Sequence, residues 1–343
     1  MPEDRSRAIA RDQRRHLVVL AFAAVSVAVV AWFAGGWATL LGPGVLALLI
    51  GTALRTAGVM NSETDRPAAS IGARILQISI VALGLSVNVV DVIAVARGSL
   101  PVMLGTLAVG LAGIWLIGRA LAVRPAVRGM LTVGTSICGA SAIAAVAPIL
   151  EAEPTEISYA VSVIFMFNIT AVIVFPTVGH LLGFSTQSFG TWAGTAVNDT
   201  SSVLAAGFAF GSGAATYAAV VKLSRTVMIL PVTVGSAVLA GRGSGEGLAN
   251  QAGRALRRAL PWFIVAFLLA SMANALGVIP SSGAKLSGTL AQLGTVLALA
   301  TIGLGTDARE VRRAGPRPLL LGLAGWLLVA STSLALQAAT GTL

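Results

Sequence analysis

Two cationic side chains lie within the apolar stretch AAVVKLSRTVMILPV. Lys222 and Arg225 are three positions apart, so they share one face of a helix. Lys222 lies roughly 12 Å inside the predicted span, at 1.5 Å per residue, which is too deep for both charges to reach one membrane surface. Arginine also matches oxyanions with two parallel hydrogen bonds. The pair therefore predicts a buried anion site.

One carboxylate accompanies these cations, in GTAVNDTSSVLAAG. Of 13 acidic residues, Asp199 alone lies deep within an apolar span. A charge there costs at least about 2.5–3.5 kcal/mol, and such residues are functional hypotheses by default. One interpretation is an Asp199–Arg225 ion pair that only joins two helices. The other is a binding site, which we favour because the second cation would be costly without a ligand.

The run GTSICGASAIAAVAP places small and hydroxyl residues where a membrane helix normally carries Leu, Val and Ile. Such residues weaken a helix and predict a break whose free ends face a mid-membrane substrate; close helix packing is the alternative use. Asn168 is a lone amide for which interhelical bonding and ligand contact are both open. The predicted substrate-binding residues are Thr135, Ser136, Cys138, Gly139, Ser141, Thr195, Asn198, Ser201, Lys222 and Arg225, and the predicted ion-coupling residues are Asp199 and Asn168.

The composition predicts an all-α polytopic membrane protein. Hydrophobic residues make up 56% of 343 positions and charged residues 10%, against about 25% charged in soluble domains. A bilayer core needs about 20 apolar residues per helix. The eleven predicted spans are 17–35, 37–55, 74–91, 100–119, 129–150, 157–181, 188–210, 214–240, 259–277, 286–305 and 318–340.

Loop charges predict the orientation. Residues 1–16 form an arginine-rich tail, and 17–343 form a single transmembrane domain. Arginines recur in the second, fourth, eighth and tenth loops, which puts the N-terminus inside the bacterial plasma membrane and the C-terminus outside; the acidic loop EAEPTE (151–156) is then external. The net charge of +10 comes from these short loops, so nucleic acid is excluded as a partner. We expect no cofactor or metal.

Two distant segments resemble each other in opposite predicted orientations, 83–105 and 302–322. Inverted repeats of this kind are typical of secondary transporters. The matched pairs are Gly84 with Gly303, Asn88 with Asp307, Asp91 with Glu310 and Pro101 with Pro318.

The runs ICGASAIAAVAP, NDTSSVLAAG, VKLSRTVMILPV and GLGTDAREVRRAGPRPLLLG resemble those of the bacterial YeiH-type membrane proteins, a family labelled sulfate exporters. The resemblance runs from about residue 36 to residue 336. It implies an inner-membrane transporter distantly similar to sodium/proton antiporters and bile-acid-type carriers, with inverted repeats and discontinuous helices at the substrate site. The family's second motif has a His-Asp pair where this chain has Asn198-Asp199.

The sequence therefore predicts a secondary transporter that exports a small sulfate- or sulfonate-like anion, coupled to a proton or sodium ion. The expected partners are that anion, the coupling cation and the bilayer, with a homodimer as an open alternative. A cation/proton antiporter with Asp199 as its ion site remains a second hypothesis. An intramembrane enzyme using Cys138 or Asp199 is disfavoured, since the sequence offers no second catalytic carboxylate, histidine base or metal-ligand cluster near them.

Overall fold

The computed structural model of the protein describes residues 23–33, 43–58, 65–226, 228, 232, 262–305 and 316–343, and within these the regular structure is helical. Four helices are long and apolar enough to cross a membrane: α4, α7, α14 and α16. The bounds are 23–33 for an N-terminal helix, then α2 Pro43–Thr56, α3 Asp65–Gly84, α4 Val89–Ala120, α5 Pro125–Ser136, α6 Ala140–Val146, α7 Pro154–Leu181, α8 Thr186–Ala196, α9 Thr200–Phe210, α10 Ser212–Thr226, α13 Trp262–Ala275, α14 Ser281–Leu304 and α16 Pro316–Thr340.

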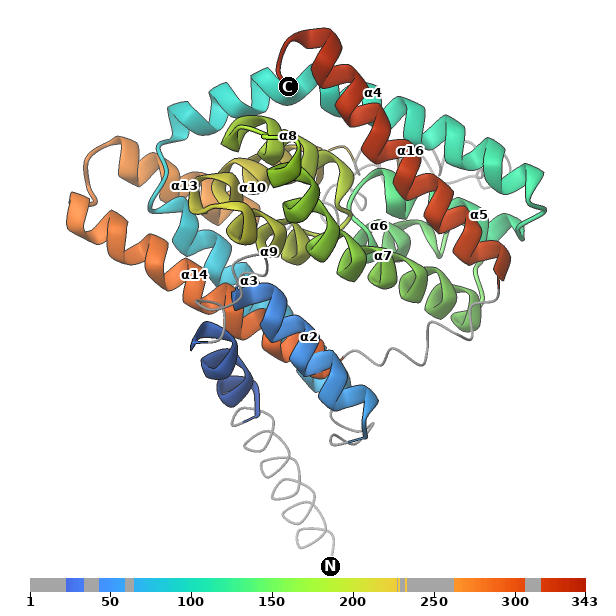
Figure 1. The fold of residues 1–343 in the computed structure, drawn as a ribbon, viewed down its shortest axis with the longest axis horizontal. Coiled ribbons are helices and arrows are strands. Elements are labelled where there is room, and N and C mark those ends of the chain that lie inside the picture. Colours follow the sequence, from blue (N-terminus) through green and yellow to red (C-terminus); the bar gives the residue numbers. More distant parts are fainter. Residues whose placement is uncertain are drawn as a thin grey trace, which may run out of the picture.

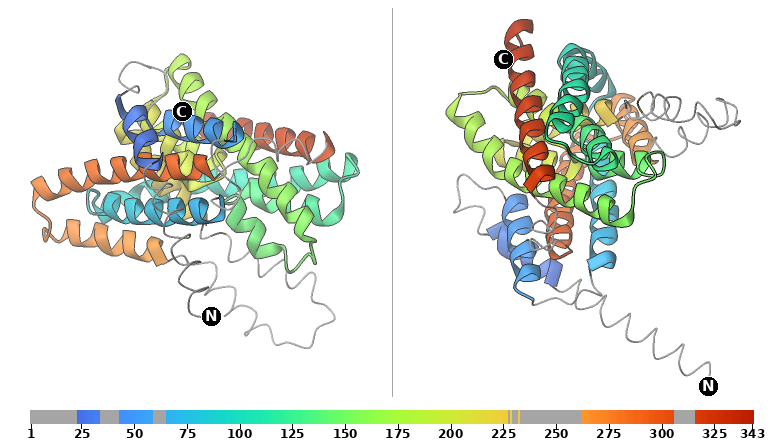
Figure 2. Two further views of the ribbon diagram at one scale, coloured as in Figure 1. Left: turned by 90° about the horizontal axis from the view of Figure 1, so that it is seen from below. Right: turned by 90° about the vertical axis from the view of Figure 1, so that its right-hand side faces the viewer.

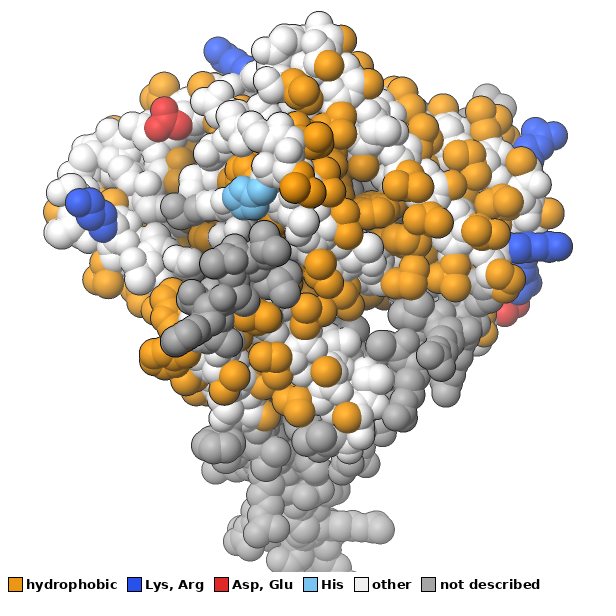
Figure 3. Space-filling view, in the orientation of Figure 1, with side chains coloured by type: hydrophobic (Ala, Val, Ile, Leu, Met, Phe, Trp, Pro, Cys, Tyr) orange, Lys and Arg blue, Asp and Glu red, His pale blue; other side chains and the backbone are white. Residues whose placement is uncertain are grey.

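The outer surface is apolar. Large hydrophobic side chains such as Leu116, Leu269 and Leu290 are exposed on α4, α13 and α14. On the face shown in Figure 3, hydrophobic side chains spread across the centre while Lys and Arg lie at the edges. Exposed apolar area of this extent is typical of a surface in contact with lipid. The all-helical membrane architecture is therefore confirmed, without fixing the number of crossings at eleven.

Helices α2, α3, α13 and α14 pack together, while α16 packs along α4. Helices α8, α9 and α10 pack together and connect these two groups, since α9 contacts α2 and α14 while α8 and α10 contact α4 (Figures 1 and 2). Helices α5 and α6 pack against α7, and α5 also packs against α4 and α16. Matched glycines from the two similar segments occupy close helix contacts. A Cβ at Gly84 would lie 2.6 Å from the carbonyl of Phe267 in α13, and one at Gly303 would collide with the carbonyl of Leu48 in α2. The matched Asp307 and Glu310 lie outside the described residues.

The first interrupted segment turns back on itself. Helix α5 begins with Pro125 at its first turn, a position that suits proline, and α6 follows after only three residues. A Cβ at Gly129 would lie 2.7 Å from Leu150, and one at Gly134 would lie 3.0 Å from Ile143. A straight helix would separate residues 129 and 150 by about 31 Å. Helices α5 and α6 therefore form a hairpin, called here the first hairpin.

The second interrupted segment also folds back. The rings of Phe189, near the start of α8, and Phe210, at the end of α9, stack with centroids 3.9 Å apart. A Cβ at Gly179, near the end of α7, would contact both rings. Since a straight helix would again separate these phenylalanines by about 31 Å, α8 and α9 form the second hairpin. Its base lies at the C-terminal end of α7.

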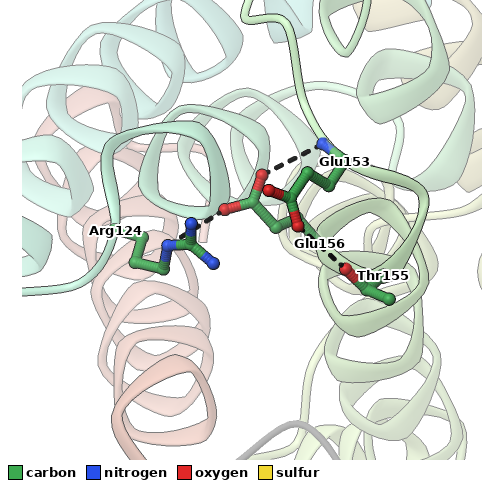
Figure 4. A network of polar contacts seen from close by, with 4 residues as sticks. All are labelled: Arg124, Glu153, Thr155 and Glu156. Atoms are coloured by element: carbon green, nitrogen blue, oxygen red, sulfur yellow. Dashed lines mark hydrogen bonds and ion pairs between the residues drawn. The ribbon is translucent and has the colours of Figure 1, made fainter.

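The base of the first hairpin lies at the other end of α7. Arg124, just before α5, pairs with Glu156 in the first turn of α7 at 3.3 Å, and Glu156 also accepts a bond from the backbone N–H of Glu153 (Figure 4). That bond belongs to a capping box, which stabilises a helix start. The two hairpins thus begin at opposite ends of α7, whose 28 residues span about 42 Å.

This geometry corrects the prediction that 129–150 and 188–210 cross the membrane. Each segment is long enough to cross, but each folds back at its break. The acidic loop 151–156 consequently lies beside the basic Arg124 loop, rather than across the membrane from it as predicted. Without these two hairpin segments, nine of the eleven predicted spans remain as crossings.

Cysteine labelling tests the first hairpin. In a Cys138→Ser background, which removes the only cysteine, Ala120→Cys and Glu151→Cys place thiols at exposed positions before and after the hairpin. We expect a membrane-impermeant maleimide to label both from the same face of oriented vesicles. Gln187→Cys, at the base of the second hairpin, is the control and should label from the opposite face. Labelling of Ala120→Cys and Glu151→Cys from opposite faces would mean that the segment crosses.

Candidate functional site

Each hairpin has a tip at its break, formed by residues 137–139 in the first hairpin and 197–199 in the second. The two tips meet beside the middle of α7. Asn168 lies about 20 Å from either end of that helix. Its side-chain oxygen accepts a hydrogen bond from the backbone N–H of Asn198 in the second tip, at 3.2 Å. A Cβ on Gly139 in the first tip would lie 3.7 Å from Asn198 and 3.2 Å from Ile164 of α7. The tips therefore meet near half-depth in the membrane, and Asn168 makes the interhelical bond that was one of its two predicted uses.

The first tip depends on one glycine. Helix α5 ends at Ser136, and Gly139 has φ 68° and ψ −129°, a conformation that side-chain-bearing residues rarely adopt. The N–H of Gly139 donates to the carbonyl of Gly134 at 2.9 Å, closing the last turn of α5. The carbonyls of Ser136 and Ile137 are then free of the helix. The predicted break in GTSICGASA is thus present, and its chain reversal starts at Ile137.

The second tip is capped by Asp199. Helix α8 ends at Ala196, and the Asp199 carboxylate accepts bonds from the N–H and hydroxyl of Ser202, at 2.9 and 2.8 Å, and from the hydroxyl of Ser201. This is the geometry of a helix N-cap. It places a negative charge at the positive end of the α9 dipole, where it is stabilising.

Lys222 joins the two tips. The side chain is fully buried, and its ammonium donates to the carbonyl of Ile137 at 2.9 Å and to the carbonyl of Val197 at 2.8 Å. Ile137 is the C-cap of α5, and Val197 is the C-cap of α8. One cation therefore neutralises the negative ends of two helices that enter from opposite faces.

Arg225 reaches the same place from one turn further along α10. It is also fully buried, and its Nε donates to the carbonyl of Ser136 at 2.9 Å, with Nη2 bonded to the same oxygen. Its Nη1 is buried without a hydrogen-bond partner, and so is the hydroxyl of Ser136. Buried polar groups are usually paired, so each of these two atoms keeps a hydrogen-bonding capacity that the protein leaves unused.

A family model described as Conserved hypothetical protein 698 matches residues 19–322. The chain belongs to this family. The resemblance to YeiH-type membrane proteins is thereby confirmed. A UPF0324 membrane protein of Streptococcus pyogenes serotype M6 is 36% identical over 323 residues, covering 92% of this chain and 95% of the relative. Another from Clostridium tetani is 33% identical over 312 residues, covering 88% and 90%. No solved structure matches the chain.

These relatives are described as membrane proteins, and their names do not state a substrate. The buried charges of this chain indicate which kind of ligand fits between the tips. Each helix C-terminus carries roughly half a negative charge, so α5 and α8 together offset about one of the two buried cations. The Asp199 carboxylate in the second tip also acts on Lys222, but it is bonded to Ser201 and Ser202, so neither cation has a carboxylate in direct contact.

The ion pair considered between Asp199 and Arg225 is not formed. Among the described residues the salt bridge within 4.0 Å is that of Arg124 with Glu156, while Asp199 is occupied with capping α9. The sequence suggested that two cations face one carboxylate, but both cations face backbone carbonyls. Backbone carbonyls at the C-terminal end of a helix can bind a buried cation. Because every residue has such a carbonyl, the sequence does not show which ones will do so.

The remaining predicted residues divide into three groups. Thr135 and Cys138 are buried in the first hairpin, and Cys138 lies near both cations. Thr195 lies near the second tip and shares a 2.7 Å hydrogen bond with Ser333 of α16. Ser141 is exposed on α6, so it does not join the buried group.

Sequence reasoning missed Ile137, Val197, Ser202 and Ser333. The first two contribute only backbone carbonyls, which apolar side chains do not reveal. Ser202 had a usable signal, because an Asp followed by hydroxyl residues at the start of an apolar run is an N-cap pattern. Ser333 lies in the last predicted span and has no local signal that connects it with Thr195.

Proposed function

We propose that this protein is a secondary transporter that carries a small oxyanion of the sulfate or sulfonate class across the bacterial plasma membrane. The observation that supports this most is a pair of fully buried cations at the meeting point of two hairpin tips, bonded to carbonyls rather than to carboxylates. Buried cations without a carboxylate in direct contact are costly, and an anion at the tips lowers that cost.

The unpaired groups suggest how an oxyanion is held. Nη1 of Arg225 donates to one anion oxygen, and the Ser136 hydroxyl donates to another. Arginine is suited to this role because it is weakly hydrated and always charged. Lys222 supplies the second positive charge while it holds the tips together.

Two hairpins that start at opposite faces suit alternating access. The site is reached from either face when one group of helices moves against the other, and irregular backbone at this depth is tolerated where it lines a site. The similar segments 83–105 and 302–322, with glycines at corresponding close contacts, support two inverted repeats around this site. The direction of net movement follows the gradients, so export requires the outward anion gradient to dominate.

The corrected topology keeps the predicted orientation. Nine crossings, like eleven, leave the termini on opposite faces, and we place the N-terminus in the cytoplasm. The arginines before the first hairpin are then cytoplasmic, as the positive-inside rule favours. The base of the second hairpin is external.

Thermal-shift measurements on the detergent-purified protein test the proposed function. We expect sulfate or ethanesulfonate to stabilise the fold, by about 2.7 kcal/mol at 100 times Kd, and chloride at equal ionic strength not to do so. Varying sodium and pH in the same screen separates the alternatives. Stabilisation by sodium alone, with no response to any sulfate, sulfite, sulfonate or carboxylate, would favour the cation antiporter with Asp199 as its site.

A further inference from the structure

The position of Lys222 points beyond anion binding to the coupling ion. Its ammonium lies between two backbone carbonyls from different hairpins, at 2.8 and 2.9 Å. Carbonyl oxygens at helix ends are also what transporters offer to a bound sodium ion or proton. Here a side-chain cation, permanently attached to α10, already fills the place between the tips.

We propose that the coupling ion is the proton, and that Lys222 carries it as a tethered cation. This rests on the proposed transport function and replaces Asp199 as the coupling residue. Both carboxylate oxygens of Asp199 are already engaged by Ser201 and Ser202 in the cap of α9. The Lys222 ammonium, by contrast, bonds two backbone carbonyls, one from each hairpin.

The two neighbouring cations differ in the chemistry that coupling needs. A guanidinium stays protonated in proteins, whereas a buried lysine exchanges its proton. Arg225 therefore keeps its charge for the anion through the whole cycle, and Lys222 changes charge. The other titratable groups that act on Lys222 are Arg225 from its own helix, Cys138 from the first tip and Asp199 from the second; α4, also packed on α10, contributes none.

The proton step follows from these neighbours. A bound anion favours the charged form of Lys222 and offsets its repulsion by Arg225. When the anion leaves, one Nζ–H bond breaks and its proton passes to water on the open side, so that a neutral amine remains. Hydrogen bonds from a neutral donor are weaker than those from a charged one, and the bonds to Ile137 and Val197 loosen. Anion and proton therefore bind together and leave together.

Proteoliposomes loaded with a pH-sensitive dye provide the test, with labelled sulfate or ethanesulfonate as the probe anion. For the unmodified protein we expect acid outside to drive uptake by at least tenfold over equal pH, with dye acidification, and no change when choline replaces sodium. Uptake that requires sodium and ignores pH would overturn the proton assignment while leaving anion transport intact. Absence of probe exchange even at equal pH would instead count against the proposed function itself.

Two variants locate the proton on Lys222. Lys222→Arg keeps a cation at the tips but holds its proton, so we expect acid-driven uptake and dye acidification to disappear, whatever rate of probe exchange at equal pH the variant retains. Lys285→Arg, an exposed lysine on α14, is the matched control and should behave like the unmodified protein. Acid-driven uptake that survives in Lys222→Arg would overturn the proposal.

If the larger arginine prevents folding, as judged by gel filtration, Lys222→Ala provides the second route. It removes the propylammonium portion of the side chain and leaves the carbonyls of Ile137 and Val197 facing the vacated volume. We expect added ethylammonium to restore at least part of the lost exchange. Folded Lys222→Ala protein that exchanges the probe anion and moves protons without any amine would overturn the proposal.

Discussion

Arg225→Ala is expected to abolish anion-dependent transport while the protein still inserts into the membrane. The substitution removes the buried guanidinium whose Nη1 lacks a protein partner. Hydrogen bonds to charged groups are worth about 1.5–3 kcal/mol, so losing even one weakens binding at least tenfold, at about 1.4 kcal/mol per tenfold. Uptake of labelled sulfate or ethanesulfonate into proteoliposomes measures the loss.

Two further variants separate a binding defect from a folding defect. Arg225→Ala also leaves the Ser136 carbonyl without its donors, and a buried unsatisfied group costs about 1–3 kcal/mol. Arg225→Lys keeps a cation for that carbonyl but lacks the guanidinium fork, so we expect near-normal melting with weakened anion binding. Arg74→Ala, at an exposed arginine on α3, should change neither. Normal transport by folded Arg225→Ala protein would remove Arg225 from the site.

Gly139→Ala is expected to be nearly as damaging, although it adds only one methyl group and removes no charge. The backbone of Gly139 has φ 68° and ψ −129°, and conformations of this kind cost a side-chain-bearing residue about 1–3 kcal/mol. The new Cβ would also lie 3.2 Å from Ile164. The first tip must therefore shift, and with it the carbonyl of Ile137 that Lys222 binds. We expect a lower melting temperature and loss of probe transport.

A second glycine gives the matched control. Gly98 lies in the long helix α4, and a Cβ built there meets nothing within 4 Å. Alanine is about 1 kcal/mol better than glycine inside a helix, so Gly98→Ala should be neutral or slightly stabilising, with normal transport. If Gly139→Ala proves equally harmless, the first tip does not depend on the left-handed backbone that the structure gives it.

The interruption at Ile137–Gly139 could be predicted, but its direction could not. Glycine and small hydroxyl residues weaken a helix locally. This effect depends on residue type alone, so it can be predicted from the sequence. Whether the chain continues or reverses after the break depends on contacts such as Gly129 with Leu150 and Phe189 with Phe210. Each interrupted segment has enough apolar residues to cross a bilayer, so length alone favoured the wrong topology.

The cations could also be predicted, but their partners could not. Depth and spacing identified Lys222 and Arg225 as an unusual buried pair. The sequence predicted Asp199 as their partner because side-chain charges can be read from a sequence, whereas the carbonyls at helix ends cannot. The actual partners are carbonyls at the C-terminal ends of α5 and α8, which become available only once the hairpins have formed. Thr195 and Ser333 likewise meet only through tertiary packing of α8 against α16.

The proposed function requires an oxyanion to bind between the hairpin tips at Arg225. An experimental structure of the protein bound to selenate, at a concentration that raises its melting temperature, tests this most directly, because selenium scatters anomalously and locates the anion. The predicted result is an anomalous peak within hydrogen-bond distance of Arg225 Nη1, beside Ser136. A peak elsewhere, with Nη1 bonded to a protein carbonyl, would contradict the claim.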